Sequence, residues 1–362
     1  MISACLVTLP GLEELAQEEV KNLAGAASVI KGSCVFFNTS ASGVCRVAYR
    51  SQSAIRVLAI PSELDPSSLT ELELSFKKTI DFGAFKNFIG KNFTFKVECE
   101  RYGIHGYKSV EASACLGTIL GSESGMEAVM DKPEIIFYLL VDSNKAVFGI
   151  DICGFDLSKR YYKVFPSPSS IRGPLAFAIR HFAGNGKLLL DPLCGSGEII
   201  IEGLLRDSAR PVRFYEREKL LISKIPVFSD FAMKVYLEKE KDINETIYAY
   251  DPHMPNVTAA KKNAKIAGVH KGIKFGRCAL DWLDVKFKKG EVNAVATNTL
   301  RCDQKQLNRL FNQLSYICKD NAIVVVAGNE KLRESCNNNG FTINSLKSIG
   351  RKPIEVYLLS KQ

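Results

Sequence analysis

The chain reads Asp191-Pro192-Leu193-Cys194-Gly195-Ser196-Gly197-Glu198 at the point where an apolar run meets a helical one. The apolar run is Lys187–Leu190, and the helix-like run is Ile199–Leu205. Gly195 and Gly197 allow the backbone to approach a ligand closely, and the start of the following helix adds free N–H groups. A buried strand that ends in an aspartate and turns through two glycines into a helix predicts a nucleotide-type cofactor site.

The composition of this loop narrows the class of cofactor. The loop lacks the Lys-Ser/Thr pair of a phosphate-cradling loop, and its glycines do not have the dinucleotide spacing G-x-G-x-x-G. The pattern therefore favours S-adenosylmethionine over ATP or NAD. The alternative is an ordinary glycine-rich turn between a strand and a helix. The repeated strand–helix pattern downstream argues against that alternative.

Strands alternate with helical patterns from the linker Pro166–Ser170 to the end of the chain. This alternation predicts an α/β fold with a mostly parallel, doubly wound sheet. A helix at 174–183, with Pro174 in its first turn, precedes the first strand. Residues 208–243 are longer than a connection needs and predict an inserted helical or loop element. The strands are expected near 187–190, 246–250, 273–276, 292–297, 321–326 and 353–359, the last forming an antiparallel hairpin with Phe341–Ser348.

The first 165 residues have mixed α and β patterns. Residues 1–65 predict the order strand, helix, strand, helix, strand. The polar segment 61–83 predicts a loop leading into a further helix. After it come an alternating strand at Phe93–Cys99, a helix around 110–129, and strands at 134–142 and 145–151 joined by a tight turn. A chain of 362 residues is long enough for two or three domains, and we expect three, at 1–65, 66–165 and 166–362.

The net charge of +9 is unevenly distributed along the chain. Residues 1–163 carry 17 basic and 19 acidic side chains, whereas residues 164–362 carry 31 basic and 20 acidic ones. The densest stretch, 261–289, has nine Lys or Arg against two Asp. Such a surplus suits a phosphate-rich partner. A solvated lysine-rich face without a partner remains an open alternative.

Composition also bears on location and on metal sites. The chain has no apolar run of 18 residues, so we expect no membrane-spanning helix. The N-terminus has neither a basic start nor a long apolar core, so we expect no signal peptide. The eleven cysteines are scattered and form no C-x-x-C pair, which predicts neither a zinc site nor a disulfide framework. Buried thiols in a reducing cytosol are expected instead.

Three further stretches carry candidate chemistry, each directly after a predicted strand. Asp251, followed by Pro252, is placed to accept ribose hydroxyls, or else it caps the next helix. Asp281-Trp282 is placed to bind an adenine amine and cover its ring, or else Trp282 is a core residue. Ligands lie beyond the carboxyl ends of strands in such sheets, so the stretch beginning at Asn298 faces the cofactor. The candidate cofactor-binding residues are Asp191, Pro192, Cys194, Gly195, Gly197, Asp251, Pro252, Asp281 and Trp282.

A family resemblance covers nearly the whole chain. It is carried, in order, by Thr8–Glu13, Arg101–Ser109, Gly149–Gly154 with Lys159–Tyr162, the glycine loop with Glu202, and the helix end Asn263–Gly268. Together these resemble the RNA guanine-N2 methyltransferases that carry an N-terminal ferredoxin-like unit and a THUMP RNA-binding domain before a Rossmann-like class I methyltransferase domain. The resemblance implies methyl transfer from S-adenosylmethionine to the exocyclic N2 amine of a guanine in tRNA. Candidate RNA phosphate contacts, which position the RNA without reading its bases, are Arg101, His105, Lys108, Lys159 and Arg160.

The chain departs from this family after the fourth strand. The family carries Asn-Pro-Pro-Tyr or a near variant there, in which the Asn side chain and a neighbouring carbonyl accept hydrogen bonds from the amine and the aromatic ring stacks on the flipped base. This chain keeps Asn298 but continues Thr299-Leu300-Arg301. The fixed φ of proline is lost, and the guanidinium plane of Arg301 is what remains to stack on a base. Asn298 and Arg301 are therefore the candidate catalytic residues.

Two functional hypotheses follow. In the first, the chain is a tRNA guanine-N2 methyltransferase in which Asn298 orients the amine in line with the methyl group and stabilises its developing positive charge. No histidine is placed as a general base. In the second, the chain is a catalytically weakened member that binds cofactor or RNA, either as a module or as one subunit of a complex. A small activator subunit is a further candidate partner, and ribosomal RNA is the alternative substrate.

Overall fold

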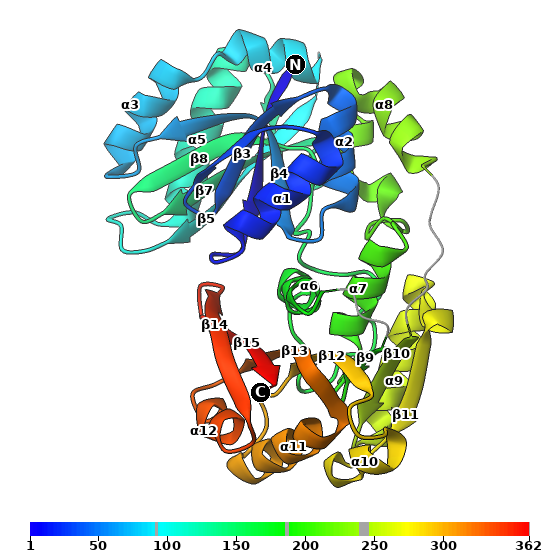
Figure 1. Cartoon of the computed structure of the whole chain (residues 1–362). Helices are drawn as coiled ribbons and strands as arrows, with labels where there is room; N and C mark the ends of the chain where they lie inside the picture. Colours follow the sequence, from blue (N-terminus) through cyan, green and yellow to red (C-terminus); the bar gives the residue numbers. More distant parts are fainter. Residues whose placement is uncertain (91–92, 185–187, 239–245, 362) are drawn as a thin grey trace. The chain divides into compact units, whose positions relative to one another are not determined.

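The structure, a computed structural model, describes residues 1–90, 93–184, 188–238 and 246–361. Lys187 of the first predicted strand and residues 239–243 of the predicted insertion lie outside these ranges. The chain forms two compact units (Figure 1). The first consists of Met1–Thr8, Glu13–Leu157 and Phe214–Glu238, and the second of Leu9–Leu12, Ser158–Arg213 and Lys239–Gln362.

The second unit contains a seven-stranded sheet in the order β11-β10-β9-β12-β13-β15-β14. The five strands from β11 to β13 are parallel, and β15 pairs antiparallel with both β13 and β14. The predicted doubly wound sheet and its terminal hairpin are therefore confirmed. The strands are β9 (Leu188–Asp191), β10 (Thr246–Asp251), β11 (Ile273–Arg277), β12 (Val292–Asn298), β13 (Cys318–Gly328), β14 (Phe341–Ile349) and β15 (Ile354–Lys361).

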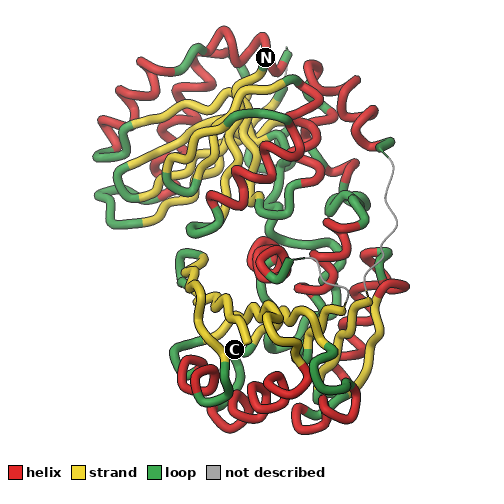
Figure 2. The backbone as a smooth tube through the Cα atoms, in the orientation of Figure 1, coloured by secondary structure: helices red, strands yellow, loops and turns green. Residues whose placement is uncertain are grey.

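Helices cover both faces of this sheet (Figure 2). Helices α6 (Gly173–Phe182) and α7 (Glu198–Asp207) pack on each other, and α9 (Met254–Ala267) packs beside α7. Helices α10 (Leu283–Lys286), α11 (Gln304–Ile317) and α12 (Leu332–Asn337) lie together on the opposite face. The chain winds in opposite directions from β9, so the carboxyl ends of β9, β10 and β12 meet at the switch point where such sheets bind ligands.

The first unit contains an eight-stranded sheet in the order β2-β3-β1-β4-β8-β7-β5-β6. Its first half has the βαββαβ order of a ferredoxin-like unit. The sequence pattern missed one strand of this unit, Ser28–Lys31, which is only four residues long and half exposed. The elements of this half are β1 (Ile2–Thr8), α1 (Glu13–Ala24), β2 (Ser28–Lys31), β3 (Cys34–Thr39), α2 (Ala41–Arg50) and β4 (Ala54–Leu64).

The second half of this sheet continues the first half without a break, because β8 pairs with both β4 and β7. The helix expected to reach residue 129 ends at Ser124, where Gly125 adopts a left-handed conformation with φ 69° and stops the helix. The predicted boundary at residue 65 thus falls within one sheet, and the division into two domains stays a prediction. The elements are α3 (Leu69–Thr79), α4 (Phe82–Ile89), β5 (Thr94–Tyr102), α5 (Ser109–Ser124), β6 (Glu127–Ala128), β7 (Ile135–Asp142) and β8 (Lys145–Asp151).

From Phe214 to Glu238 the predicted insertion is mainly helical and belongs to the first unit. It comprises two short 3-10 turns, Arg217–Lys219 and Leu221–Ser223, and helix α8 (Pro226–Tyr236). Phe228 and Val235 of α8 are buried in the core of the first unit, where α8 packs on α2 and α4. Within the described ranges, the longest apolar helix falls short of what a membrane crossing requires.

Candidate active site

The glycine loop follows β9 directly and is built for close approach. Gly195 and Gly197 have φ values of +51° and +90°, which L-residues adopt at a cost. A Cβ on Gly195 would lie 2.7 Å from the hydroxyl of Ser169, and a Cβ on Gly197 would lie 3.1 Å from the Cβ of Ala260 in α9. The first glycine therefore allows the linker to pass over the loop, and the second allows α9 to pack against it.

Asp191 ends β9 with a fully buried side chain. Its Oδ1 accepts hydrogen bonds from the Thr297 hydroxyl at 2.7 Å and from the Leu193 N–H at 3.2 Å. Its Oδ2 is also buried and has no hydrogen-bond partner among the described residues. Burial raises the pKa of Asp191 to about 8, against the effect of the two hydrogen bonds, and the charges of Asp251 and Glu198 add to the rise. A buried carboxyl with one unsatisfied oxygen fits a cationic ligand.

Asp251 connects the end of β10 to the glycine loop. Its Oδ2 accepts the Gly195 N–H at 3.1 Å, and its Oδ1 accepts the His253 N–H at 2.9 Å and the Asn256 side-chain amide at 3.0 Å. The N-cap of α9 is His253, so the alternative that Asp251 caps this helix is wrong. The carbonyl of the next residue, Pro252, accepts a hydrogen bond from Arg277 at 3.1 Å. The ribose contact of Asp251 and Pro252 stays a prediction.

Asp281 and Trp282 lie at the surface after β11. Asp281 is half exposed and forms an ion pair with Arg309 of α11 at 3.1 Å. The Trp282 side chain is 65% exposed, so the alternative that it is a core residue is wrong. An exposed ring is free to cover a ligand, and the adenine contact of this pair stays a prediction.

Asn298 is buried at the end of β12. Its Nδ2 donates to the Ser169 carbonyl at 2.8 Å, and its Oδ1 accepts the Leu300 N–H at 3.1 Å. An amide oxygen can accept two hydrogen bonds, so Oδ1 keeps the capacity to accept one from a substrate amine. Arg301, two residues beyond Thr299, is exposed, which agrees with a role in stacking on a base but does not test it.

Thr299 stands where the resembling family carries a proline. Its N–H and its hydroxyl both donate to the Ala327 carbonyl of β13, at 2.8 and 3.0 Å, and the residue is buried. These two bonds hold the backbone that a proline ring would otherwise restrict. The loop after Asn298 is therefore fixed in place without the ring.

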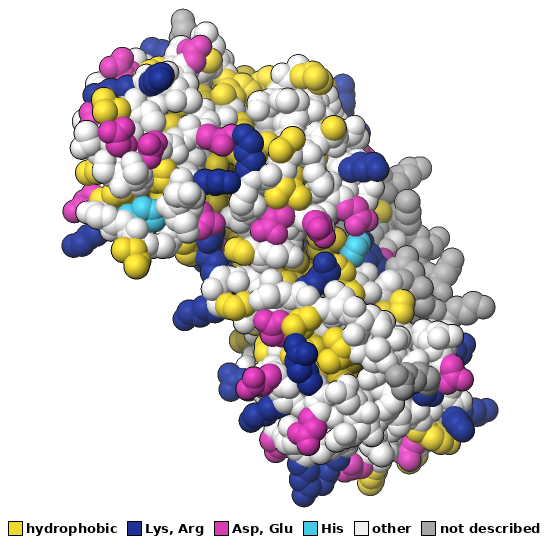
Figure 3. Space-filling view, turned by 60° about the vertical axis from the view of Figure 1, so that its left-hand side comes forward, with side chains coloured by type: hydrophobic (Ala, Val, Ile, Leu, Met, Phe, Trp, Pro, Cys, Tyr) yellow, Lys and Arg dark blue, Asp and Glu magenta, His cyan; other side chains and the backbone are white. Residues whose placement is uncertain are grey.

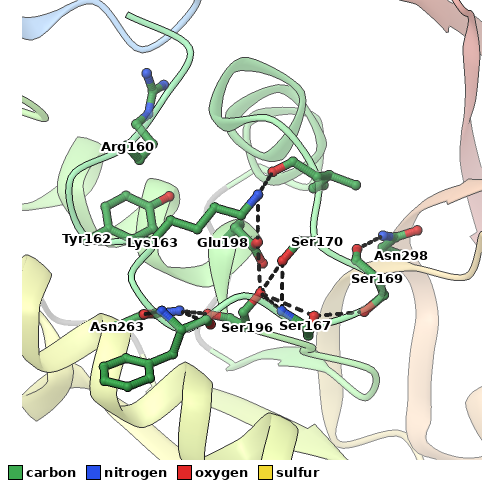
Figure 4. Close-up of polar contacts among 12 residues, drawn as sticks. Arg160, Tyr162, Lys163, Ser167, Ser169, Ser170, Ser196, Glu198, Asn263 and Asn298 are labelled. Carbon is green, nitrogen blue, oxygen red and sulfur yellow. Dashed lines mark hydrogen bonds and ion pairs between the residues drawn. The ribbon is translucent and has the colours of Figure 1, made fainter.

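The linker Pro166–Ser170 crosses the glycine loop and is hydrogen-bonded to it (Figure 4). Ser196 of the loop is fully buried, and its hydroxyl contacts the Ser170 hydroxyl at 2.6 Å and donates to Glu198 at 2.8 Å. It also accepts the Ser167 N–H at 3.2 Å. The sequence pattern identified this segment only as a linker, since a Pro/Ser composition carries no signal for a site.

Asn263 of α9 is hydrogen-bonded both to Phe165, directly before the linker, and to Ser196 of the glycine loop. Its side chain is fully buried, and its Nδ2 donates to the carbonyls of Phe165 and Ser196, both at 2.9 Å. Its Oδ1 accepts the Phe165 N–H at 3.0 Å. In the sequence, Asn263 belongs to a helix end of the family pattern, and only the fold shows that it positions the linker against the loop.

A pocket of about 10 Å³ lies between the linker, the glycine loop and β12. Its lining includes Ser169, Cys194, Gly195, Glu198 and Asn298, which brings the candidate cofactor and amine-binding residues together. The volume holds about one water molecule. Burial holds the pKa of the Cys194 thiol well above its ordinary value, so this thiol remains protonated.

The structure corrects the prediction for Arg160. Its side chain is buried and forms a two-pronged ion pair with the buried Glu202 of α7, at 2.7 and 3.1 Å. The hydroxyl of Tyr162 donates to the same carboxylate at 2.7 Å, and Lys163 pairs with Glu198 one turn earlier at 3.2 Å. Arg160 anchors the start of the linker to the helix of the cofactor loop, so a phosphate contact does not fit its position. The basic residues around Arg160 in the sequence gave no indication that its side chain would be buried.

The other four candidate RNA contacts are at least partly accessible. Arg101 and His105 of the first unit are half-buried and contact each other at 3.1 Å, and Lys108 is exposed. Lys159 is exposed in the second unit. Figure 3 shows dark-blue Lys and Arg side chains at the surface, interspersed with magenta Asp and Glu side chains. These positions agree with phosphate contacts, which stay a prediction.

Relatives of similar length carry matching sequences. The chain is 24% identical to a tRNA (guanine(6)-N2)-methyltransferase of Methanocaldococcus jannaschii, over 93% of this chain and 94% of the relative. It is 25% identical to one of Archaeoglobus fulgidus, over 86% and 78%. It also matches a ribosomal RNA large subunit methyltransferase K/L of Acinetobacter baumannii with 26% identity, over 72% of this chain but 38% of that longer protein.

Solved structures show the same fold over the full length. A possible methylase from Clostridium difficile superposes with a TM-score of 0.81 at 18% identity, covering 99% of this chain and 98% of that one. TrmN from Thermus thermophilus superposes with a TM-score of 0.71 at 19% identity, covering both chains completely. The predicted Rossmann-like class I methyltransferase fold is thereby confirmed.

The family comparison matches the part of the chain that holds the glycine loop and Asn298. The model of the RMKL-like methyltransferase domain, UPF0020, matches residues 160–342, which is half of the chain. This range begins at Arg160, the anchor of the linker, and includes every candidate cofactor and catalytic residue. The chain therefore belongs to the UPF0020 family of RMKL-like methyltransferase domains.

Proposed function

We propose that this protein transfers a methyl group from S-adenosylmethionine to the exocyclic N2 amine of a guanine in tRNA, in the cytosol. One observation carries the proposal: Ser169 lies between the glycine loop and Asn298, contacting the amide of Asn298 at 2.8 Å. A cofactor loop and an amine-binding amide thus share one pocket. Relatives of nearly equal length named tRNA (guanine(6)-N2)-methyltransferases support the choice of substrate.

The residues around the loop fit S-adenosylmethionine. Asp191, with its unsatisfied buried oxygen, would hold a positively charged group, and Gly195 and Gly197 would allow the backbone to contact the ligand. Asp251, Pro252, Asp281 and Trp282 would contact the adenosine. The bound cofactor supplies a methyl group on a positively charged sulfur, which is already an electrophile.

The chain's own contribution to the reaction is positioning. Asn298 Oδ1 accepts a hydrogen bond from the guanine amine, which directs the nitrogen lone pair toward the methyl group and stabilises the positive charge that develops on nitrogen. The bonds from Asn298 to Ser169 and Leu300 hold this oxygen in place. Arg301 stacks on the flipped base, in the position that an aromatic ring has in the resembling family.

The first unit supplies most of the RNA contacts in this proposal. Residues 66–165 form a THUMP-like domain behind a ferredoxin-like unit at 1–65, and residues 166–362 form the methyltransferase domain. Arg101, His105 and Lys108 contact phosphates in the THUMP-like part, and Lys159 does so at the start of the second unit. Contacts of this kind fix the register of the RNA.

The deciding experiment incubates the purified full-length protein with radiolabelled S-adenosylmethionine and either bulk unmodified tRNA or ribosomal RNA. Label in tRNA, recovered as N2-methylguanosine after nuclease digestion, is the expected result. Label in ribosomal RNA alone would redirect the proposal to that substrate. Incorporation that requires an added cell extract would identify the need for an activator subunit.

The replacement of the family's aromatic residue by Arg301 supports a second candidate function. In that alternative the protein binds cofactor and RNA without turnover, as a module or as a subunit of a complex. Measurable binding of both ligands by the purified protein, with no incorporation even in extract, would establish the second function and exclude the first.

A further inference from the structure

A groove of about 520 Å³ lies on the second unit and is lined by other residues than the pocket at the glycine loop. One wall is the segment Val164–Pro166, and the other is the first half of α9, from Met254 to Lys262. The groove is mainly apolar, with Val164 57%, Met254 53% and Phe165 38% exposed. Its volume is in the range of small-ligand sites, and the residues that line it have no part in the proposed reaction.

The wall formed by Phe165 is fixed in place. The Phe165 N–H donates to Asn263 Oδ1 at 3.0 Å, and its carbonyl accepts from Asn263 Nδ2 at 2.9 Å. Asn263 itself is fully buried. An exposed aromatic ring on an anchored backbone binds a partner with little loss of conformational entropy.

The charged side chains that α9 contributes beside the groove are all positive. The Lys262 ammonium lies 4.6 Å from the centroid of the Phe165 ring, so an apolar surface and a cation adjoin at one place. Lys261 and Lys265 are exposed on the same helix, and α9 contains no acidic residue. An aromatic platform next to lysines is the combination with which proteins bind single-stranded nucleic acid.

We propose that this groove binds a single-stranded stretch of RNA, with a base on Phe165 and Met254 and a phosphate on Lys262. The choice of RNA rests on the proposed function, to which the groove adds a base-stacking subsite. Phe165 lies four positions before Ser169, whose carbonyl contacts Asn298, and four chain steps span at most ~14 Å. The nucleotide in the groove is therefore a close neighbour of the guanosine at Asn298.

The test measures the affinity of the full-length protein for a fluorescein-labelled, unmodified tRNA transcript by fluorescence anisotropy over a range of salt concentrations. Phe165→Ala is expected to weaken binding about tenfold through the loss of one stacked base. Lys262→Ala is expected to weaken binding and to lower the slope of log K against log salt by about one. Photocrosslinking of a 4-thiouridine-containing transcript should label Phe165 or Met254.

Two substitutions on α11, on the opposite face of the sheet, serve as matched controls. Tyr316 is 45% exposed and Lys305 is exposed, so Tyr316→Ala and Lys305→Ala remove a similar ring and the same charge. Both should bind tRNA like the unaltered protein. Equal losses in the groove variants and the α11 variants, or unaltered affinity in Phe165→Ala, would overturn the proposal.

The experiments distinguish a failure of the groove proposal from a failure of the proposed function. Thermal stabilisation by S-adenosylmethionine checks that each variant is folded, and Phe165→Leu replaces Phe165→Ala if the latter loses this response. A protein that crosslinks at the groove but transfers no methyl group supports the groove and contradicts the proposed function. If the unaltered protein methylates tRNA and Phe165→Ala binds tRNA with unaltered affinity, the proposed function is supported and the groove proposal is contradicted.

Discussion

Asn298 Nδ2 donates a hydrogen bond to the Ser169 carbonyl over 2.8 Å, between residues 129 positions apart in the chain. This bond joins the end of β12 to the linker, and the linker is itself bonded to the glycine loop through Ser167 and Ser170. The residue proposed to bind the substrate amine and the loop proposed to bind the cofactor are thus connected by one short segment. A shift of this segment on cofactor binding would also reposition Asn298.

Asn298→Ala should reduce methyl transfer by roughly 10²-fold, the cost of removing one preorganised group that acts in the transition state. Binding of S-adenosylmethionine should persist, because the contacts of Asp191 and the glycine backbone remain. Initial rates of label incorporation and isothermal titration with the cofactor measure the two effects. The exposed Asn338, changed to alanine, is the matched control. Equal rates in both variants would remove Asn298 from the mechanism.

Arg301→Phe restores an aromatic ring at the position where the resembling family carries one. We expect it to keep or raise the rate of transfer, since a phenyl ring stacks on a base as a guanidinium does. Arg301→Ala removes either kind of stacking and should lower the rate about tenfold, within the 1–3 kcal/mol attributed to one stacked base. If Arg301→Ala transfers methyl groups as fast as the unaltered protein, the side chain has no stacking role.

The raised pKa of Asp191, about 8, predicts a pH dependence of cofactor binding. A cationic ligand binds the ionised carboxyl, which is a minor form below pH 8, so affinity should rise about tenfold between pH 7 and pH 9. Asp191→Asn keeps the shape but cannot ionise, and titration of this variant reports any pH dependence that belongs to the ligand. Parallel curves for the two proteins would show that Asp191 does not bind the cation.

The same shift predicts the effect of Asp191 on stability. Its pKa in the folded protein lies above the ordinary value of 3.8, so the fold binds a proton that the unfolded chain releases between about pH 4 and pH 8. The free energy of unfolding therefore falls as the pH rises through this window. Denaturant titrations at pH 5 and pH 8 should show a smaller fall for Asp191→Asn than for the unaltered protein.

Gly195→Ala should abolish cofactor binding, whereas Gly340→Ala should leave it unchanged. Both glycines have positive φ, at +51° and +74°, but only at Gly195 would a Cβ collide with the linker, whereas Gly340 has open space around it. Both variants should lose a similar ~1–2 kcal/mol of stability from the left-handed backbone. Only Gly195→Ala should then fail to respond to S-adenosylmethionine in a thermal-shift assay. A normal response would mean that the loop tolerates displacement of the linker.

Arg160→Ala should destabilise the second unit by about 3–5 kcal/mol, because it leaves the Glu202 carboxylate buried without its cation. Arg309→Ala breaks the half-exposed pair with Asp281 and should cost less than about 1 kcal/mol. Denaturant unfolding followed by the fluorescence of Trp282, the single tryptophan and a residue of the second unit, measures both. Similar losses in the two variants would contradict the assignment of Arg160 as a buried anchor.

Local patterns in the sequence were enough to predict the doubly wound sheet and its glycine loop. Period-two runs, helical runs and left-handed glycines are properties of neighbouring residues, so β9 to β15 and the end of α9 at Gly268 could be located without the fold. The same patterns missed the four-residue strand Ser28–Lys31 and extended α5 past Gly125. Ser28–Lys31 pairs with the adjacent strand β3 across a two-residue turn, whereas β6, directly after α5, pairs with the distant strand β5.

The partners of the buried polar groups depend on the tertiary structure. Arg160 lies in a basic run that looks exposed in the sequence, yet Glu202, 42 residues away, pairs with it inside the second unit. Asn263 and Ser196 are 67 residues apart and meet at the linker, and α8 completes the core of the first unit from within the second half of the chain. The residue type alone indicates that a polar group needs a hydrogen-bond partner when it is buried. Which residue becomes that partner is decided by the packing of segments far apart in the chain.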